Sequence, residues 1–208
     1  MKGLIGWMNR IINYLDELFP NPECELVFKT DYQLIISVML SAQTTDKRVN
    51  EVTSILYKKY SSLEKLMNAN VNDIKTIIRP LGSYNKKAEN IIEISKQINN
   101  LGYVPNNREF LESLPGVGRK TANVVLGILF NIPCVAVDTH VTRVSKRLEL
   151  VDENDDVLII EKKLSILLKN DNMVKRHHQL LLFGRYYCKA KKPLCENCKI
   201  KCKKSPIL

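Results

Sequence analysis

One short stretch of the sequence, LPGVGRKTANVV at 114–125, places a lysine where it could act as a nucleophile. Gly116 and Gly118 can supply the positive φ angles of a tight turn, and Lys120 follows in the first turn of a predicted helix. The positive end of the helix macrodipole disfavours an ammonium group there, and partial burial would disfavour it further. Since the interaction of an exposed charge with the helix dipole is worth only about 0.3–1 kcal/mol, burial would have to contribute most of the free energy that disfavours the ammonium form. A neutral amine is a nucleophile, whereas a lysine that only extends into solvent is a surface charge.

The same turn is a candidate binding site for a phosphate group. Backbone N–H groups in a glycine turn, together with the N-terminus of the following helix, point outward and favour an anion. The residues that would contribute are Gly116, Val117, Gly118, Arg119 and Thr121. Such contacts hold the backbone of DNA without reading its sequence. The alternative is an ordinary corner between two helices, in which the glycines only turn the chain.

Asp138 is a candidate for the carboxylate that a lysine nucleophile would need. Attack of an amine on C1′ of a nucleotide sugar expels the base and builds positive charge on the sugar, which a nearby carboxylate stabilises. The residue follows the apolar run CVAV and precedes a predicted helix, in the motif AVDTHVTRV. From position alone the favoured role is that of an N-cap, because aspartate is among the best N-cap residues. The two roles can coexist.

Four cysteines near the C-terminus have the spacing C-x6-C-x2-C-x3-C and are candidate metal ligands: Cys188, Cys195, Cys198 and Cys202. Four thiolates suit either a zinc ion or a [4Fe–4S] cluster. Zinc sites commonly use two CxxC pairs, and only Cys195 and Cys198 form one here, which favours the iron–sulfur cluster. His177 and His178 are alternative ligands, although histidines at the start of a helix are more often structural or exposed.

The charge of the chain favours a polyanionic partner. The 208 residues include 32 lysines and arginines against 22 acidic residues, a net charge of +10, and eight of the basic residues lie between 185 and 204 with one glutamate. Nucleic acid is the leading candidate. No apolar run approaches the roughly 20 residues that span a membrane, and the first twenty residues contain acidic side chains that a signal peptide lacks. We therefore expect an intracellular monomer of the cytoplasm and nucleoid that binds DNA and no membrane.

The elements that must position these groups are predicted to be helices. Apolar residues recur every three or four positions in most segments, and no segment alternates with a period of two for long enough to make a sheet. The run LIISVML at 34–40 is apolar all round, and its continuation into SAQ favours a buried helix over a buried strand. The predicted helices cover 4–18, 31–40, 45–56, 61–67, 70–79, 85–99, the glycine turn to 130, 139–148, 156–168 and 174–187. The predicted class is all-α.

With LPGVGRKTANVV, VDTHVTRV, LSAQTTD and the C-terminal cysteines taken together, the chain resembles the endonuclease III family of helix-hairpin-helix DNA glycosylases over nearly its whole length. The resemblance implies a bilobed all-α fold with a C-terminal metal-cluster loop. One lobe, 25–132, would be a six-helix barrel domain that contains the helix-hairpin-helix. The other lobe would combine 1–24 with 133–208 and carry the four-cysteine loop. The cleft between the lobes would hold the lesion.

The resemblance also implies the reaction. Lys120 would be the nucleophile and Asp138 the catalytic carboxylate of a bifunctional enzyme of base excision repair, a DNA glycosylase and abasic-site lyase. It would excise oxidised pyrimidines from damaged double-stranded DNA through a Schiff base and cleave the strand 3′ to the abasic site by β-elimination. The alternatives are a monofunctional glycosylase, which Lys120 disfavours, and a DNA-binding module without chemistry.

Further roles follow from the same resemblance. Gln43, in LSAQTTD, would enter the gap left by the flipped nucleotide. Ser83 occupies the position of an apolar residue that wedges the opposite strand, so Tyr84 or Leu81 could take over that role. The four cysteines would hold a structural [4Fe–4S] cluster, with zinc as the alternative, and their last spacer has three residues where the family has five.

Overall fold

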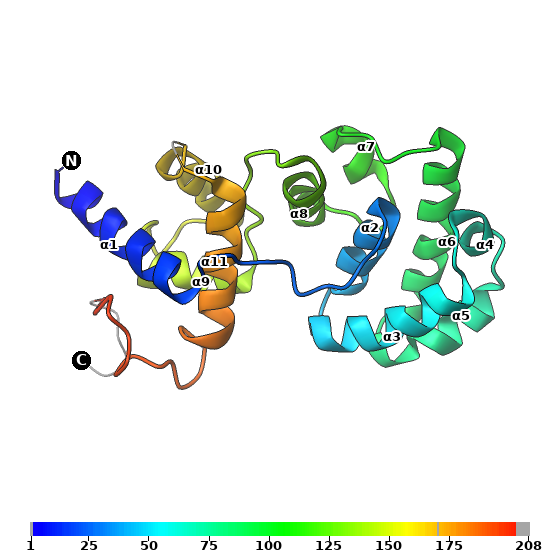
Figure 1. Cartoon of the computed structure of the whole chain (residues 1–208), viewed down its shortest axis with the longest axis horizontal. Helices are drawn as coiled ribbons and strands as arrows, with labels where there is room; N and C mark the ends of the chain where they lie inside the picture. The colour runs from blue at the N-terminus through cyan, green and yellow to red at the C-terminus, as the bar shows by residue number, and fades with distance from the viewer. Residues whose placement is uncertain (1, 170, 203–208) are drawn as a thin grey trace. The chain divides into compact units, whose positions relative to one another are not determined.

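The computed structural model describes residues 2–169 and 171–202, with the backbone alone described for 2–5. Over these residues all regular elements are helical, so the all-α class is confirmed (Figure 1). The elements are α1 (Lys2–Leu18), α2 (Asp31–Leu40), α3 (Asp46–Lys59), α4 (Leu63–Met67), α5 (Val71–Ile78), the 3-10 turn η1 (Arg79–Leu81), α6 (Tyr84–Leu101), α7 (Arg108–Ser113), α8 (Arg119–Phe130), α9 (Thr139–Arg147), α10 (Val157–Leu167) and α11 (Met173–Tyr186). None of the helices in this part of the chain is both long enough and apolar enough to cross a membrane.

The chain divides into two compact units. One is continuous and consists of Cys24–Asn131, while the other combines Met1–Glu23 with Ile132–Leu208. The continuous unit therefore contains α2 to α8, and the second unit contains α1 and α9 to α11.

Helix α2 is the central helix of the continuous unit. Every residue from Gln33 to Leu40 is buried, which agrees with the prediction of a helix that is apolar all round. It contacts α3, α6 and α8 (Figure 1). The two buried polar side chains of α2 have partners within the unit: the hydroxyl of Ser37 pairs with that of Tyr57 at 3.0 Å, and Oε1 of Gln33 accepts the backbone N–H of Lys29 at 2.8 Å. The packing fixes the C-terminal end of α2 at Leu40, just before Gln43.

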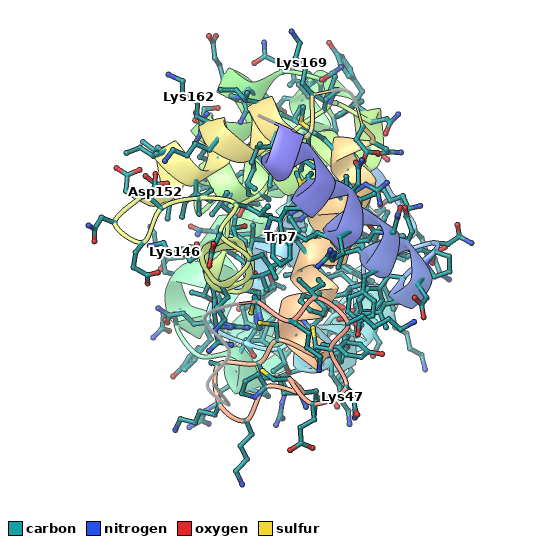
Figure 2. All side chains as sticks on the ribbon, turned by 90° about the vertical axis from the view of Figure 1, so that its left-hand side faces the viewer. Trp7, Lys47, Lys146, Asp152, Lys162 and Lys169 are labelled. Atoms are coloured by element: carbon teal, nitrogen blue, oxygen red, sulfur yellow. The ribbon has the colours of Figure 1, made fainter. Side chains whose placement is uncertain are left out.

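The second unit has its own apolar core, to which both ends of the chain contribute. Met8, Ile11 and Leu15 of α1 are buried against residues of α9, α10 and α11. The indole N–H of Trp7 donates to the carbonyl oxygen of Leu148 at 2.7 Å, and Figure 2 shows this ring beneath α1 while Lys162 and Lys169 point outward. The N-terminal helix is therefore an integral part of this unit.

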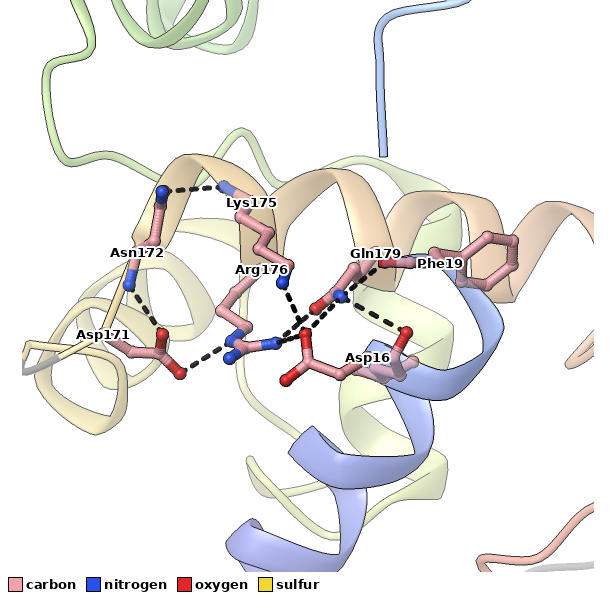
Figure 3. A network of polar contacts seen from close by, with 8 residues as sticks. Asp16, Phe19, Asp171, Asn172, Lys175, Arg176 and Gln179 are labelled. Atoms are coloured by element: carbon pink, nitrogen blue, oxygen red, sulfur yellow. Dashed lines mark hydrogen bonds and ion pairs between the residues drawn. The ribbon is translucent and has the colours of Figure 1, made fainter. Parts of the chain in front are cut away.

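A polar network around the buried side chains of Arg176 and Gln179 joins the end of α1 to α11 (Figure 3). The guanidinium group of Arg176 contacts Asp16 at 2.8 Å and Asp171 at 2.6 Å, and its side chain is only 8% exposed. The amide of Gln179 donates to the carboxylate of Asp16 at 3.0 Å and to the carbonyl of Phe19 at 2.8 Å. The hydrogen bond from Arg176 holds the pKa of Asp16 well below its usual range. Burial raises the pKa of Asp171, but the hydrogen bonds from Arg176 and from the backbone N–H of Asn172, together with the positive charge of Arg176, outweigh burial, and the net shift of the pKa is downward.

This network predicts a specific pH dependence of stability. Because the pKa values of Asp16 and Asp171 are lower in the folded chain than the usual value of about 3.9, their contribution is fully present above that value and is lost as the pH falls through the folded values. Asp16→Asn should lower the free energy of unfolding by about 1–3 kcal/mol at pH 7 and should lose less stability between pH 7 and pH 3 than the unaltered chain. Urea unfolding followed by circular dichroism at the two pH values measures both effects. An identical loss in the two proteins would show that Asp16 does not contribute to the acid sensitivity.

Candidate catalytic and DNA-binding site

The glycine turn lies between α7 and α8. The fold requires a glycine at only one of its two glycine positions. Gly116 has φ +79°, and a Cβ atom there would lie 2.4 Å from the side-chain nitrogen of Asn90 and 3.2 Å from Met39. Gly118 has φ −97°, which any residue adopts, and a Cβ atom there would meet nothing within 4 Å. The prediction of positive φ is therefore right for Gly116 and wrong for Gly118. The free chain does not need a glycine at 118, so the bare backbone there is available for a ligand to approach.

The remaining residues of the turn lie directly before α8 and in its first turn. Val117 is 4% exposed, and its N–H donates to the carbonyl of Leu114 at 3.0 Å, so its side chain anchors the turn and only its backbone can face a ligand. Gly118 is the N-cap of α8 and has no side chain to bond the first-turn N–H groups, which have no acceptor within the helix. Arg119 is exposed and Thr121 is half-buried. The start of α8 is therefore suited to binding an anion.

Two alanine variants should separate folding from ligand binding in this turn. Gly116→Ala should destabilise the protein by about 1–3 kcal/mol, because it combines a positive φ with a clash against Asn90. Gly118→Ala should change stability by less than about 0.5 kcal/mol and weaken binding to an abasic-site duplex about tenfold. Urea unfolding and fluorescence anisotropy with labelled DNA measure the two effects. Unchanged affinity in Gly118→Ala would contradict the phosphate role of the turn.

Lys120 is the second residue of α8, in the first helical turn as predicted. The side chain is exposed, so the partial burial that the sequence argument required is not found in the chain alone. Its position leaves the amine accessible to a bound molecule. Lys120 belongs to the unit Cys24–Asn131 and Asp138 to the other unit.

Asp138 is the N-cap of α9, which confirms the capping role. Its carboxylate accepts the backbone N–H of Val141 at 2.8 Å, and the residue is half-buried. The four residues before it, Cys134–Val137, are buried and hold the start of α9 in place. The cap bond uses one carboxylate oxygen, which leaves the second oxygen for other interactions.

Two arginines farther along α9 connect this helix to the start of the cysteine loop, a contact that the sequence analysis missed. Arg143 donates to the carbonyls of Cys188 at 3.0 Å and Gly184 at 2.7 Å. Arg147 donates to the carbonyl of Lys189 at 2.7 Å and to the sulfur of Cys188 at 3.5 Å. The spacing of four residues, which puts both guanidinium groups on one helix face, is the only sequence signal for this role.

Gln43 and Ser83 both lie at exposed positions beside the ends of helices. Gln43 follows the end of α2 with φ +61°, and Ser83 is the N-cap of α6 with φ +48° and makes no side-chain cap bond. Tyr84 is the first residue of α6 and is half-buried. A fourth residue, Lys87, was not predicted: it is 6% exposed, and burial lowers its pKa. Its place on the apolar face of α6, four residues before Ile91, is the signal that could have identified it.

The four cysteines are half-buried, and Cys188, Cys198 and Cys202 pack against the core of the second unit. Burial raises the pKa of the Cys198 thiol, and the nearby Cys188 and Cys195 raise it further. Within residues 2–169 and 171–202, the structure assembles no group of three or more His, Cys, Asp and Glu side chains in an arrangement that could hold a metal ion. The donor set itself, four thiols in one loop, has the chemistry that a [4Fe–4S] cluster requires.

The two candidate histidine ligands are buried in α11. His177 is 5% and His178 6% exposed, and the Nδ1 atom of His178 lies 2.9 Å from the carbonyl oxygen of Val174. Burial lowers the pKa of His178. The two histidines therefore have a structural role in the packing of α11, as their position at the start of a helix indicated.

Comparisons with known proteins show that the chain is similar to DNA repair proteins in both sequence and fold. Residues 36–170 match the HhH-GPD superfamily, described as base excision DNA repair protein. The chain is 44% identical over 189 residues to endonuclease III of Bacillus subtilis (strain 168), covering 90% of this chain and 86% of that protein. A non-covalent endonuclease III–DNA complex has a TM-score of 0.90 at 40% identity and covers 94% of each chain. A trapped covalent endonuclease III–DNA intermediate has a TM-score of 0.88 at 40% identity, over 93% of this chain and 92% of that one.

Proposed function

Because the chain belongs to the endonuclease III family of DNA glycosylases and abasic-site lyases of base excision repair, we propose that Lys120 is its nucleophile and Asp138 its catalytic carboxylate. The observation that carries the proposal is the exposed amine of Lys120 in the first turn of α8, directly after a glycine that the fold does not require. The similar protein trapped in a covalent complex with DNA supports a nucleophile on the protein.

The proposed reaction has two parts. The neutral amine of Lys120 attacks C1′, the bond from C1′ to the base breaks, and the base leaves with the electron pair and takes up a proton. The bond from C1′ to the ring oxygen O4′ then breaks, O4′ takes up the proton that the nitrogen releases, and C1′ and the nitrogen of Lys120 form the double bond of a protonated Schiff base. A C2′ proton is then removed, and the bond from C3′ to the oxygen of the 3′ phosphate breaks by β-elimination, so that the phosphate leaves with the electron pair. Asp138 stabilises the positive charge that develops on the sugar. The proposed substrates are oxidised pyrimidines in double-stranded DNA, flipped out of the helix before the reaction.

DNA itself supplies the burial that Lys120 lacks in the free chain. A bound duplex excludes water from the first turn of α8, which favours the neutral amine over the ammonium form. The backbone of Gly116, Val117 and Gly118, with Arg119 and Thr121, contacts phosphate groups. Gln43 fills the gap left by the flipped nucleotide, and Ser83 with Tyr84 contacts the opposite strand. In this assignment 25–132 is the domain with the hairpin, and 1–24 with 133–208 is the domain with the cysteine loop.

The reaction can be tested on the intact protein. Borohydride reduces a Schiff base to a stable amine, so the protein should form a covalent adduct with a duplex that contains an abasic site. Gel electrophoresis under denaturing conditions detects the adduct. A protein that releases the base or binds the duplex but is never trapped would be a monofunctional glycosylase or a DNA-binding module.

We assign Cys188, Cys195, Cys198 and Cys202 as the ligands of a structural [4Fe–4S] cluster. Bound there, the cluster would hold a loop rich in lysine in a fixed shape, so that it can contact phosphate groups. The purified protein should be brown and contain about four iron atoms per chain, and Cys198→Ser should lose colour and iron. Metal analysis and the absorption spectrum measure this. Zinc in a colourless protein would support the alternative metal, and a protein without either would contradict the assignment.

A further inference from the structure

One buried lysine contacts both of the segments that carry the residues proposed to enter the duplex. The Nζ atom of Lys87 donates to the carbonyl oxygens of Leu40 at 3.0 Å, Ala42 at 2.9 Å and Leu81 at 3.2 Å. Leu40 is the last residue of α2, and Ala42 directly precedes Gln43. Leu81 ends η1, two residues before Ser83. A single ammonium group therefore joins the segment before Gln43 to the segment before Ser83.

In both segments one residue has an unfavourable backbone conformation that neighbouring residues must stabilise. Gln43 and Ser83 have φ angles of +61° and +48°, in the left-handed region that residues other than glycine rarely occupy. Such conformations persist only where the surrounding structure fixes them, and they are concentrated at functional sites. Both residues are exposed, whereas Lys87 is 6% exposed. Lys87 thus holds the two segments from the buried side, and the side chains of Gln43 and Ser83 can face a ligand on the exposed side.

An ammonium group suits this position better than an apolar side chain would. The carbonyl of Leu40 lies at the C-terminal end of α2, where helix carbonyls lack donor partners within the helix and the macrodipole favours a positive charge. An ammonium has three donors, and three carbonyl oxygens receive them. Ala88, Ile91, Ile94 and Ile98 of the same helix are buried and apolar, and the other buried polar residues of α6, Asn90 and Ser95, are uncharged, so packing alone does not call for a lysine at position 87.

We propose that Lys87 is a positioning residue that sets Gln43 and Ser83 at a fixed spacing for entry into duplex DNA. The inference rests on the proposed function, because it requires that these two segments contact the lesion-bearing duplex. Lys87 does not touch the reacting atoms. Its effect should appear only when the substrate has a second strand and stacked bases that must be displaced.

The test compares two methionine variants on two substrates. Lys87→Met keeps the length of the side chain and removes its donors, while Lys86→Met removes the same charge from the adjacent exposed lysine, which pairs with Glu89. Strand cleavage is measured in single turnover with saturating protein, on an abasic-site duplex and on the same abasic strand without its complement. Lys87→Met should be about 10- to 100-fold slower on the duplex and nearly unchanged on the single strand. Lys86→Met should match the unaltered protein on both substrates.

A spectroscopic signal and a double variant separate positioning from general damage. With 2-aminopurine opposite the abasic site, the fluorescence increase on binding should be lost in Lys87→Met and kept in Lys86→Met. Adding Lys87→Met to Gln43→Ala should slow the duplex reaction by much less than Lys87→Met does alone. If Lys87→Met does not fold, as judged by circular dichroism, Lys87→Gln replaces it in the same experiments. The glutamine amide has two N–H donors, so it cannot bond all three carbonyl oxygens.

Three results would overturn the inference. One is a duplex reaction of Lys87→Met as fast as that of the unaltered protein. Another is an equal loss on duplex and single strand in a folded variant, which means that Lys87 only stabilises the fold. The third is an intact protein that cleaves neither substrate; that result removes the proposed function as well and is recognised without any variant.

Discussion

Lys120→Ala is expected to abolish the borohydride-trapped adduct and to slow strand cleavage at an abasic site by about ten-thousandfold or more, as is usual when a covalent nucleophile is removed. Affinity for the abasic-site duplex should change by less than about fivefold, since one exposed lysine contributes only a small part of the contact with phosphates. Denaturing gels measure the adduct, and fluorescence anisotropy measures the affinity. The contrast between lost chemistry and retained binding distinguishes a nucleophile from a phosphate contact.

Two controls make this result specific. Lys120→Gln, which keeps a long polar side chain without an amine, should be as inactive as Lys120→Ala. Lys96→Ala removes an exposed lysine of α6 to which we assign no role and should behave like the unaltered protein. An adduct that still forms in Lys120→Ala would place the nucleophile on another residue.

Asp138→Asn should separate the two roles of this residue. Asparagine is as good an N-cap as aspartate, and its side-chain oxygen can accept the N–H of Val141, so the free energy of unfolding should change by less than about 0.5 kcal/mol. The negative charge is lost, and the rate of base excision should fall by about 10²- to 10⁴-fold. Urea unfolding and single-turnover kinetics measure the two quantities.

Asp138→Ala completes the comparison. It removes both the cap and the charge, so it should lower the free energy of unfolding by about 0.5–2 kcal/mol and be as slow as Asp138→Asn. If Asp138→Asn kept nearly full activity while Asp138→Ala lost stability, Asp138 would be an N-cap and nothing more.

Local sequence predicted the α-helices of the described residues except the short α7 (Arg108–Ser113), because most of their signals are local. The apolar run at 34–40 became a buried helix, and the position of Asp138 before Thr139 gave a real N-cap. Lys120 stands in the first turn of α8 as its spacing from the glycines predicted. Each of these features depends on neighbours within a few residues.

The features that the sequence did not reveal depend on residues far apart in the chain. Gly116 and Gly118 look equivalent in the motif, but only Gly116 lies against Asn90 from another helix. Lys87 looks like one more surface lysine beside Lys86, and its partners at Leu40 and Ala42 lie more than forty residues away. The exposure of Lys120 likewise follows from how the helices pack, which a motif does not contain.

The second unit combines segments from before and after the continuous unit, and this affects the order in which the protein can fold during synthesis. Residues 24–131 can complete their core as soon as they have left the ribosome, because all of their elements are consecutive. Helix α1 is synthesised before the continuous unit, yet Arg176 and Gln179, which hold its C-terminal end, are synthesised after that unit. During synthesis the apolar face of α1 therefore stays uncovered until α9 to α11 have been made, and the cysteine loop, which follows α11, cannot pack against this core before then.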